Sequence, residues 1–224
     1  MRMTKLTHAC IRLEKPGGPA GGNRVLVIDP GTFSEVEEAL DGAQAFLVTH
    51  EHPDHLDLDR TGAALAADTG LEAWAPAAVA DQLKEAAPSA ADRIHVAEPE
   101  TEFDAAGFHV KTFGSQHALI HASVPVVANI GYLVDGEVFH PGDSFTVPHG
   151  VSVSTLLVPI HAPWSKVGEV LDFMIAVGAT RAYPIHNALL NERGTGIAEG
   201  HAKRIGAKYG TEYVHLEPGE SVDL

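Results

Sequence analysis

The chain has 224 residues, with 30 Asp and Glu against 15 Lys and Arg, so its formal net charge is −15 when histidine is neutral. This charge opposes binding of a polyanion, and no run of Lys or Arg offsets it, so nucleic acid is not expected as a partner. Cys10 is the single cysteine, which excludes an intramolecular disulfide and a cysteine-based zinc finger.

Length and composition also bear on domain organisation and location. We predict one domain over 1–224, because no linker rich in Pro, Ser or charge divides the chain. Residues 1–14 contain no apolar stretch long enough for a signal peptide, and later apolar regions are interrupted by polar residues. We therefore expect a cytoplasmic protein without a membrane partner. The sequence does not decide between a monomer and a homo-oligomer.

The first half of the chain begins with two strand patterns and continues with alternating helices and strands. The runs at 4–13 and 24–31, joined by the glycine- and proline-rich segment 16–22, predict a hairpin. Ser34 precedes three glutamates and predicts the capped start of a short helix that ends at Leu40. The pattern then predicts, in order, a strand at 45–48, a helix at 59–68, a strand at 71–75, a helix at 76–87 and a strand at 93–98.

From residue 103 onwards the pattern changes to short β-type runs and then returns to alternation. The pair Asp135-Gly136 between two apolar runs is a strong hairpin signal. The short runs predict antiparallel strands at 103–104, 108–113, 124–134 and 138–139. The last part predicts strands at 155–160, 181–185 and 212–216, and helices at 165–177 and 196–209. Together these elements predict a layered α/β fold with helices on the outer faces of the sheets.

Three histidines and one aspartate lie within six residues at the end of a predicted strand: His50, His52, Asp54 and His55. Neutral imidazoles and carboxylates together suit zinc and similar divalent metals. His50 and His52 are two residues apart and point the same way in an extended segment, so both can bind one ion. The bend at Pro53 can direct Asp54 and His55 to a second point, so that one loop serves two metals roughly 3.5 to 4 Å apart.

One loop cannot complete two coordination spheres, so further ligands are expected at other strand ends. Function commonly lies where a strand of a rigid layered scaffold gives way to a loop. Each of three other residues follows a predicted strand in this way: His117, Asp143 and His186.

These residues resemble the metallo-β-lactamase superfamily of metal-dependent hydrolases, in order and spacing, over nearly the whole chain. The resemblance is carried by the run His50-Glu51-His52-Pro53-Asp54-His55, by His117, by Pro141-Gly142-Asp143 and by Pro184-Ile185-His186. It implies a four-layer αββα sandwich with the site along the upper edge of the two sheets. It also implies that one metal is held by His50, His52 and His117, the other by Asp54, His55 and His186, and that Asp143 bridges them.

Within the superfamily, the opening His8-Ala9-Cys10, the turn Ile28-Asp29-Pro30-Gly31 and the compact length resemble the small, lactonase-like members. His52 stands where flavodiiron oxidoreductases have a glutamate, which favours hydrolysis. The tRNA 3′-processing endonucleases carry an inserted arm that binds RNA, and the sequence has no basic insertion of that kind. We place His8 itself in the first strand, as a hydrogen-bonded histidine outside the site.

The expected cofactors are two divalent metal ions, with zinc favoured over manganese and iron, although His and Asp serve all three. Water between two such ions ionises near neutral pH, and Asp54 is placed both to bind a metal and to accept a hydrogen bond from that water. His121 and His161 are candidates for the general acid. We predict a hydrolase of a small-molecule ester, lactone, amide or phosphodiester. The alternatives are a nuclease of the same fold, an iron-dependent oxidoreductase of the superfamily and a metal-stabilised binding module without turnover.

Overall fold

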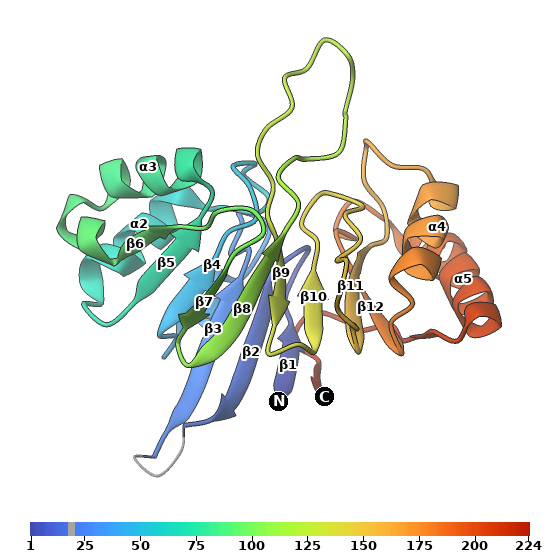
Figure 1. The fold of residues 1–224 in the computed structure, drawn as a ribbon, viewed down its shortest axis with the longest axis horizontal. Helices are drawn as coiled ribbons and strands as arrows, with labels where there is room; N and C mark the ends of the chain where they lie inside the picture. Colours follow the sequence, from blue (N-terminus) through green and yellow to red (C-terminus); the bar gives the residue numbers. More distant parts are fainter. Residues whose placement is uncertain (18–20) are drawn as a thin grey trace.

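Two seven-stranded β-sheets form the centre of the molecule, and helices cover their outer faces (Figure 1). The computed structural model describes residues 1–17 and 21–224. Residues 18–20 belong to the segment that we predicted to join the first hairpin, and they lie outside the described residues. The arrangement confirms the predicted αββα sandwich.

The first sheet has the strand order β14-β1-β2-β3-β4-β5-β6. Its strands are β1 (Arg2–Lys5), β2 (Ile11–Pro16), β3 (Asn23–Ile28), β4 (Ala45–Leu47), β5 (Glu72–Ala75), β6 (Ile94–Val96) and β14 (Ser221–Asp223). Neighbouring strands are antiparallel from β14 to β3 and parallel from β3 to β6. The helical segments between these strands are α1 (Val36–Leu40), α2 (Leu58–Ala67), α3 (Ala77–Ala86) and the short 3₁₀ helix η2 (Pro88–Arg93).

The second sheet has the strand order β13-β12-β11-β10-β9-β8-β7. Its strands are β7 (Glu102–Ala105), β8 (Phe108–Phe113), β9 (Gly131–Val134), β10 (Val138–His140), β11 (Thr155–Pro159), β12 (Arg181–Ile185) and β13 (Glu212–Tyr213). Its helices are α4 (Val167–Val177) and α5 (Glu192–Tyr209), which pack side by side (Figure 1). None of the helices in the described part of the chain is long and apolar enough to cross a lipid bilayer.

Apolar side chains on both faces of the sheets explain the layers. Along β3, Leu26 and Ile28 belong to the core between the two sheets, whereas Val25 and Val27 belong to the core beneath α2 and α3. A third core lies between the second sheet and helices α4 and α5, and Phe139 of β10 is part of it. Strands that are buried on both faces appear in a sequence as nearly continuous apolar runs. This is why the runs that became β3, β4 and β11 were recognisable.

The hairpin predicted at Asp135-Gly136 is confirmed, and the helix predicted at 165–177 ends where expected. Residues 135–137 join β9 to β10, and Asp135 and Gly136 have φ values of 50° and 70°, the left-handed values typical of tight hairpin turns, while the Glu137 backbone N–H donates to the Val134 carbonyl at 2.9 Å. Gly178 ends α4 in the left-handed region with φ 63°.

Several predicted boundaries were wrong. The run 4–13 is not one strand, because a turn that contains His8 in a left-handed conformation, φ 65°, separates β1 from β2. Of the predicted strand 124–134, only β9 forms, and the preceding residues belong to a long loop. Ser34 does not cap α1, because its hydroxyl donates instead to the Thr7 carbonyl at 2.8 Å.

The C-terminal part also differs from the prediction. Helix α5 begins at Glu192 rather than at Gly196, because the Asn191 side chain accepts a hydrogen bond from the Gly194 backbone N–H at 2.9 Å and caps the helix earlier. The predicted strand 212–216 is reduced to β13, and β14, which pairs with β1, was not predicted.

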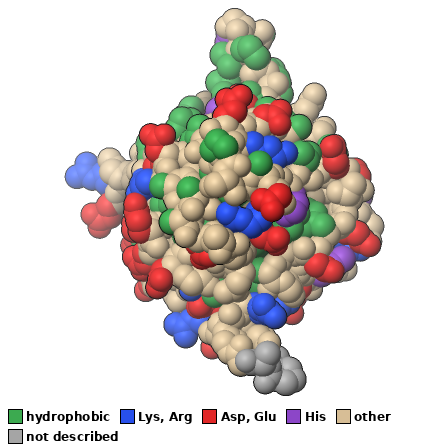
Figure 2. Space-filling model, turned by 90° about the vertical axis from the view of Figure 1, so that its left-hand side faces the viewer, with side chains coloured by type: hydrophobic (Ala, Val, Ile, Leu, Met, Phe, Trp, Pro, Cys, Tyr) green, Lys and Arg blue, Asp and Glu red, His purple; other side chains and the backbone are tan. Residues whose placement is uncertain are grey.

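The loop between β8 and β9, residues 114–130, projects from the body of the molecule (Figure 1). It carries exposed apolar side chains, which gather on the projection at the top of Figure 2. Leu119, Ile120, Val124 and Val126 are each at least 40% exposed. The base of this loop carries His117 and therefore connects the projection to the site described next.

Candidate metal centre

The histidines and aspartates that were predicted as ligands come together at loops that follow strand ends. The loop after β4 carries His50, His52, Asp54 and His55, and the other three residues follow β8, β10 and β12. Most of these side chains are buried, which is unusual for so many polar groups unless they are paired or bind a metal. Convergence of these side chains was the main structural expectation from the sequence.

The first group of side chains consists of His50, His52, His117 and Asp143. Each offers one ligand atom, and the four atoms lie within 4.8 Å of one another. His50 Nε2 is 3.1 Å from His52 Nδ1, and His117 Nε2 is 3.3 Å from Asp143 Oδ2. The group therefore has the size and the donor set of a single divalent cation site.

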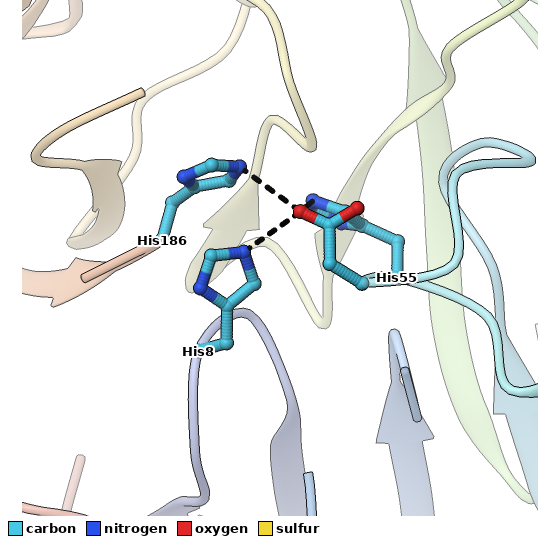
Figure 3. A group of neighbouring side chains, drawn as sticks. His8, His55 and His186 are labelled. Carbon is cyan, nitrogen blue, oxygen red and sulfur yellow. Dashed lines mark hydrogen bonds and ion pairs between the residues drawn. The ribbon is translucent and has the colours of Figure 1, made fainter. Parts of the chain in front are cut away.

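The second group consists of His8, Asp54, His55 and His186, whose ligand atoms also lie within 4.8 Å of one another. Figure 3 shows the three histidine rings pointing towards the same space. Asp54 Oδ2 lies 3.0 Å from His8 Nε2, 3.5 Å from His186 Nε2 and 3.9 Å from His55 Nε2. Three of these residues were predicted as ligands, whereas His8 was not.

Asp143 contacts residues of both groups. Its Oδ2 is 3.3 Å from His117 Nε2 and 3.1 Å from His186 Nε2, and its Oδ1 is 3.0 Å from His55 Nε2. The indole N–H of Trp164 donates a hydrogen bond to the same Oδ2 at 2.8 Å. One carboxylate thus lies between the two groups, where the family resemblance implies a bridging ligand.

His55, His117 and His186 each use Nδ1 for a hydrogen bond outside the site, so that each Nε2 faces the centre. The Nδ1 of His55 contacts the Asp29 carboxylate at 2.7 Å, that of His117 the Ala118 carbonyl at 2.6 Å, and that of His186 the His161 carbonyl at 2.7 Å. Because these oxygens can only accept, each Nδ1 is the protonated donor. The Nε2 atoms of the three rings and Oδ1 of Asp143 are buried, and although they lie 3.0 to 3.3 Å from their nearest partners around Asp143, among the described residues none of these contacts has the geometry of a hydrogen bond. Atoms of this kind, aimed at one another, fit a bound cation.

The pKa shifts of the two carboxyl groups point the same way. Burial alone would raise the pKa of Asp54, but contacts with His186 and His8 hold it well below its usual range. Burial likewise opposes ionisation of Asp143, and the neighbouring His55, His117 and His186 nevertheless hold its pKa low. Both carboxylates are therefore ionised at neutral pH and need not lose a proton to bind a metal.

The pKa values of His50 and His186 shift in opposite directions, because burial lowers both and only at His186 do carboxylates outweigh it. Burial lowers the pKa of His50, and the neighbouring His55 lowers it further, so His50 is neutral and ready to bind a metal. Burial also lowers the pKa of His186, but Asp143 and Asp54 outweigh it and raise the value to about 9. In the metal-free protein a proton on His186 supplies positive charge beside the two carboxylates, and a metal ion would displace that proton.

Asp29 supports the site, and the sequence indicated no role for it on its own. It entered the sequence analysis only within the turn Ile28-Asp29-Pro30-Gly31, which resembles the lactonase-like members. It is fully buried, and its carboxylate accepts hydrogen bonds from the Thr49 backbone N–H and the Thr49 hydroxyl, both at 2.7 Å. Its third contact is the His55 Nδ1 described above. Because these contacts fix both the start of the ligand loop and the His55 ring, Asp29 orients the site without facing its centre. The available signal was an acidic residue directly after an apolar strand.

His8 was wrongly placed in a strand and outside the site. It lies in the turn between β1 and β2, it is fully buried, and its Nε2 reaches Asp54. The backbone N–H of Ala188 donates to its Nδ1 at 3.4 Å, which makes Nδ1 the acceptor and Nε2 the protonated donor to Asp54. The segment His8-Ala9-Cys10 carried part of the family resemblance, but sequence spacing did not show that His8 reaches Asp54, because its partners are 46 and 180 residues away.

The two predicted general acids are not brought to the centre. The His121 side chain is exposed in the projecting loop, where its Nδ1 contacts the Ser123 hydroxyl at 2.7 Å. His161 contributes its backbone carbonyl to His186. Neither lines the cavity of about 350 Å³ that opens above the two groups.

Comparison with known proteins agrees with this geometry. Residues 2–186 match the family model of a beta-lactamase superfamily domain. The chain belongs to the metallo-β-lactamase superfamily. Protein Rv0786c of Mycobacterium tuberculosis is 38% identical in sequence to this chain over 205 residues. The aligned segment covers 89% of this chain and 90% of that protein.

Solved structures also resemble this superfamily member. Igni18, a metallo hydrolase from the archaeon Ignicoccus hospitalis, matches with a TM-score of 0.70 and 16% identity over 99% of this chain and 97% of that chain. CmlA, a diiron β-hydroxylase from Streptomyces venezuelae, matches with a TM-score of 0.67 and 13% identity over all of this chain and 54% of that chain. At such identities these likenesses show the fold alone.

Substitution of Asp29 tests its orienting role. In Asp29→Asn, the side-chain N–H₂ would face one of the three donors that now contact the carboxylate, so we expect divalent metal affinity to fall by roughly 10- to 100-fold. Competition with a chromophoric chelator measures the affinity, and Asp41→Asn, at an exposed aspartate, serves as the matched control. Wild-type affinity in a folded Asp29→Asn protein would contradict the role.

Proposed function

We propose that the protein is a metal-dependent hydrolase in which two divalent ions activate water for attack on a small ester, lactone, amide or phosphodiester. The observation that carries this proposal is the set of three buried Nε2 atoms, of His55, His117 and His186, that face the Asp143 carboxylate without a hydrogen bond of good geometry among the described residues. Membership of a superfamily of metal-dependent hydrolases supports it.

The residues divide into two ligand sets in this proposal. His50, His52 and His117 would hold one ion, Asp54, His55 and His186 would hold the other, and Asp143 would bridge them. A pair of bound ions supplies a water of lowered pKa and polarises the oxygen of the scissile group. Asp54, already ionised, would accept a hydrogen bond from the attacking water. Trp164, through its bond to Asp143 Oδ2, would hold the bridging carboxylate in place.

We propose that His8 holds Asp54 rather than ligating a metal. Its Nε2 carries the proton that reaches Asp54, and a protonated nitrogen has no lone pair for a cation. His8 would then position the Asp54 carboxylate, as outer contacts commonly do for metal-binding carboxylates.

Zinc is the metal that we propose, since the donor set is imidazole and carboxylate. The same donors serve iron, and the likeness in fold to the diiron enzyme CmlA makes an iron-dependent oxidoreductase the second candidate. We propose a cytoplasmic location, because the single cysteine, Cys10, is buried and free. The net charge of −15 disfavours the nuclease alternative.

The need of some leaving groups for a proton limits the substrates that we propose. His121 and His161, the predicted general acids, do not line the cavity, and their role as acids stays a prediction without structural support. A poor leaving group needs a proton from such an acid. We therefore favour esters and lactones over amides as substrates.

Asp54→Ala tests the proposed mechanism. We expect hydrolysis to fall to background, because the variant loses both a ligand and the acceptor for water, while His50, His52 and His117 still bind one ion. Elemental analysis and a screen of small esters, lactones and phosphodiesters measure the two effects, and Asp59→Ala, on the exposed face of α2, is the control. Full activity in Asp54→Ala would rule out the mechanism, and iron without hydrolysis would favour the oxidoreductase.

The role of His8 is tested by comparing His8→Phe with His8→Gln. Removal of the donor in His8→Phe should weaken binding of one of the two ions by roughly 10- to 100-fold, and His8→Gln, which restores an N–H, should recover part of this loss. At saturating metal both variants should still bind two ions per chain. Loss of one ion from both variants at saturation would show instead that His8 is a ligand.

A further inference from the structure

The cavity above the metal centre has an apolar wall that packing does not explain. Three of its large apolar side chains are well exposed: Phe33 at 44%, Ile120 at 43% and Leu189 at 55%. They come from loops that follow three different strands, β3, β8 and β12. Exposed apolar side chains that gather around one opening mark a binding site more often than single ones do.

The remaining wall is also apolar. Pro53, Pro163 and Trp164 complete it, and the indole N–H of Trp164 is already used by Asp143. Trp164 therefore presents only its ring to the cavity. The polar lining comes from His52, Asp54, His117, Asp143 and His186, which are all proposed ligands. Once these residues hold metal, the wall offers a substrate apolar contact alone.

Positive charge is absent from this wall. No lysine or arginine lines the cavity within the described part of the chain, and the protein as a whole is acidic. Enzymes that bind phosphate or carboxylate groups usually place Arg, Lys or backbone N–H groups against them. A phosphodiester would thus find cationic contacts at the metal ions only, and its charge would oppose the field of the protein.

We infer that the substrate is a small neutral ester or lactone whose acyl part is an apolar chain or ring, and that Ile120 and Leu189 set this preference. The inference rests on the proposed hydrolase function and narrows its substrate class. Hydrolysis adds one water to the carbonyl carbon and breaks the acyl C–O bond, which gives a carboxylic acid and an alcohol from an ester, or a single hydroxy acid from a lactone. The cavity volume, about 350 Å³, lies at the lower end of the range for small-molecule sites, so the substrate is small.

Ile120 links this preference to the projecting loop. It belongs to the segment 114–130, whose base also carries His117, so one loop supplies both a proposed metal ligand and part of the wall. The Phe33 ring instead packs against the His8 ring in an edge-on arrangement, with 5.1 Å between the two ring centroids. Ile120 and Leu189 are therefore the better positions for substitution, because both are exposed and neither belongs to one of the three apolar cores.

The test compares p-nitrophenyl acetate, butyrate, hexanoate and octanoate with bis-p-nitrophenyl phosphate, using metal-loaded protein. Each methylene buried against the wall should raise kcat/KM about fourfold until the cavity is filled. The phosphodiester should be the poorest substrate. Ile120→Ser and Leu189→Ser should each lower the ratio of hexanoate to acetate hydrolysis. Ile197→Ser, at a 65% exposed isoleucine of α5 that does not line the cavity, should leave this ratio unchanged.

A binding measurement separates the wall from turnover. Affinity for acetohydroxamate, hexanohydroxamate and octanohydroxamate, measured by calorimetry, should rise with chain length in the wild type and rise less in Ile120→Ser. Hydrolysis without chain-length preference, or preference for the phosphodiester, would overturn the substrate class and leave the hydrolase standing. Absence of hydrolysis from all substrates would overturn the proposed function, and a flat hydroxamate series would then overturn the apolar wall as well.

Discussion

At the centre of this protein, histidine Nε2 atoms and the oxygens of Asp143 face one another across 3.0 to 3.3 Å, and positive charge between them makes that arrangement favourable. His55, His117 and His186 have their outward nitrogens bonded to fixed acceptors, so their inward nitrogens cannot turn away. Asp143 lies among them with its carboxylate ionised. Protons can supply the charge in the metal-free protein, and divalent metals supply it with better geometry.

The loop after β4, which carries His50 to His55, is held in place by contacts with the end of β3 and the turn that follows it. Asp29, at the end of β3, bonds Thr49 and the His55 ring, and the following Pro30-Gly31 turn lies directly beneath the loop. A Cβ atom on Gly31 would collide with the backbone of Asp54 and His55, so the turn requires glycine at this place. The two sheets then bring the remaining ligands to the same edge. Rigid strands thus place most of these side chains at one edge of the sheets, and the base of the long loop 114–130 adds His117.

The sequence predicted what is local and missed what depends on distant contacts. The His50 to His55 run was recognisable because four candidate ligands, three His and one Asp, stand within six residues, and His117, Asp143 and His186 followed from their places at strand ends. His8 and Asp29 act through partners far along the chain, so no spacing revealed them. One boundary failed for the same reason, because β14 forms only by pairing with β1. The start of α5 was missed although its signal is local, because Asn191 caps the helix through the Gly194 backbone N–H. The apolar wall was also invisible, since Phe33, Ile120 and Leu189 meet only in the folded protein.

The central claim is that these side chains bind a pair of cations, and anomalous diffraction from crystals of metal-loaded protein tests it most directly. Data collected at the absorption edge of the metal should show two peaks roughly 3.5 to 4 Å apart. One peak should lie within bonding distance of His117 and the other of His186, with the Asp143 carboxylate between them. A single peak, or ions that do not contact Asp143, would contradict the account.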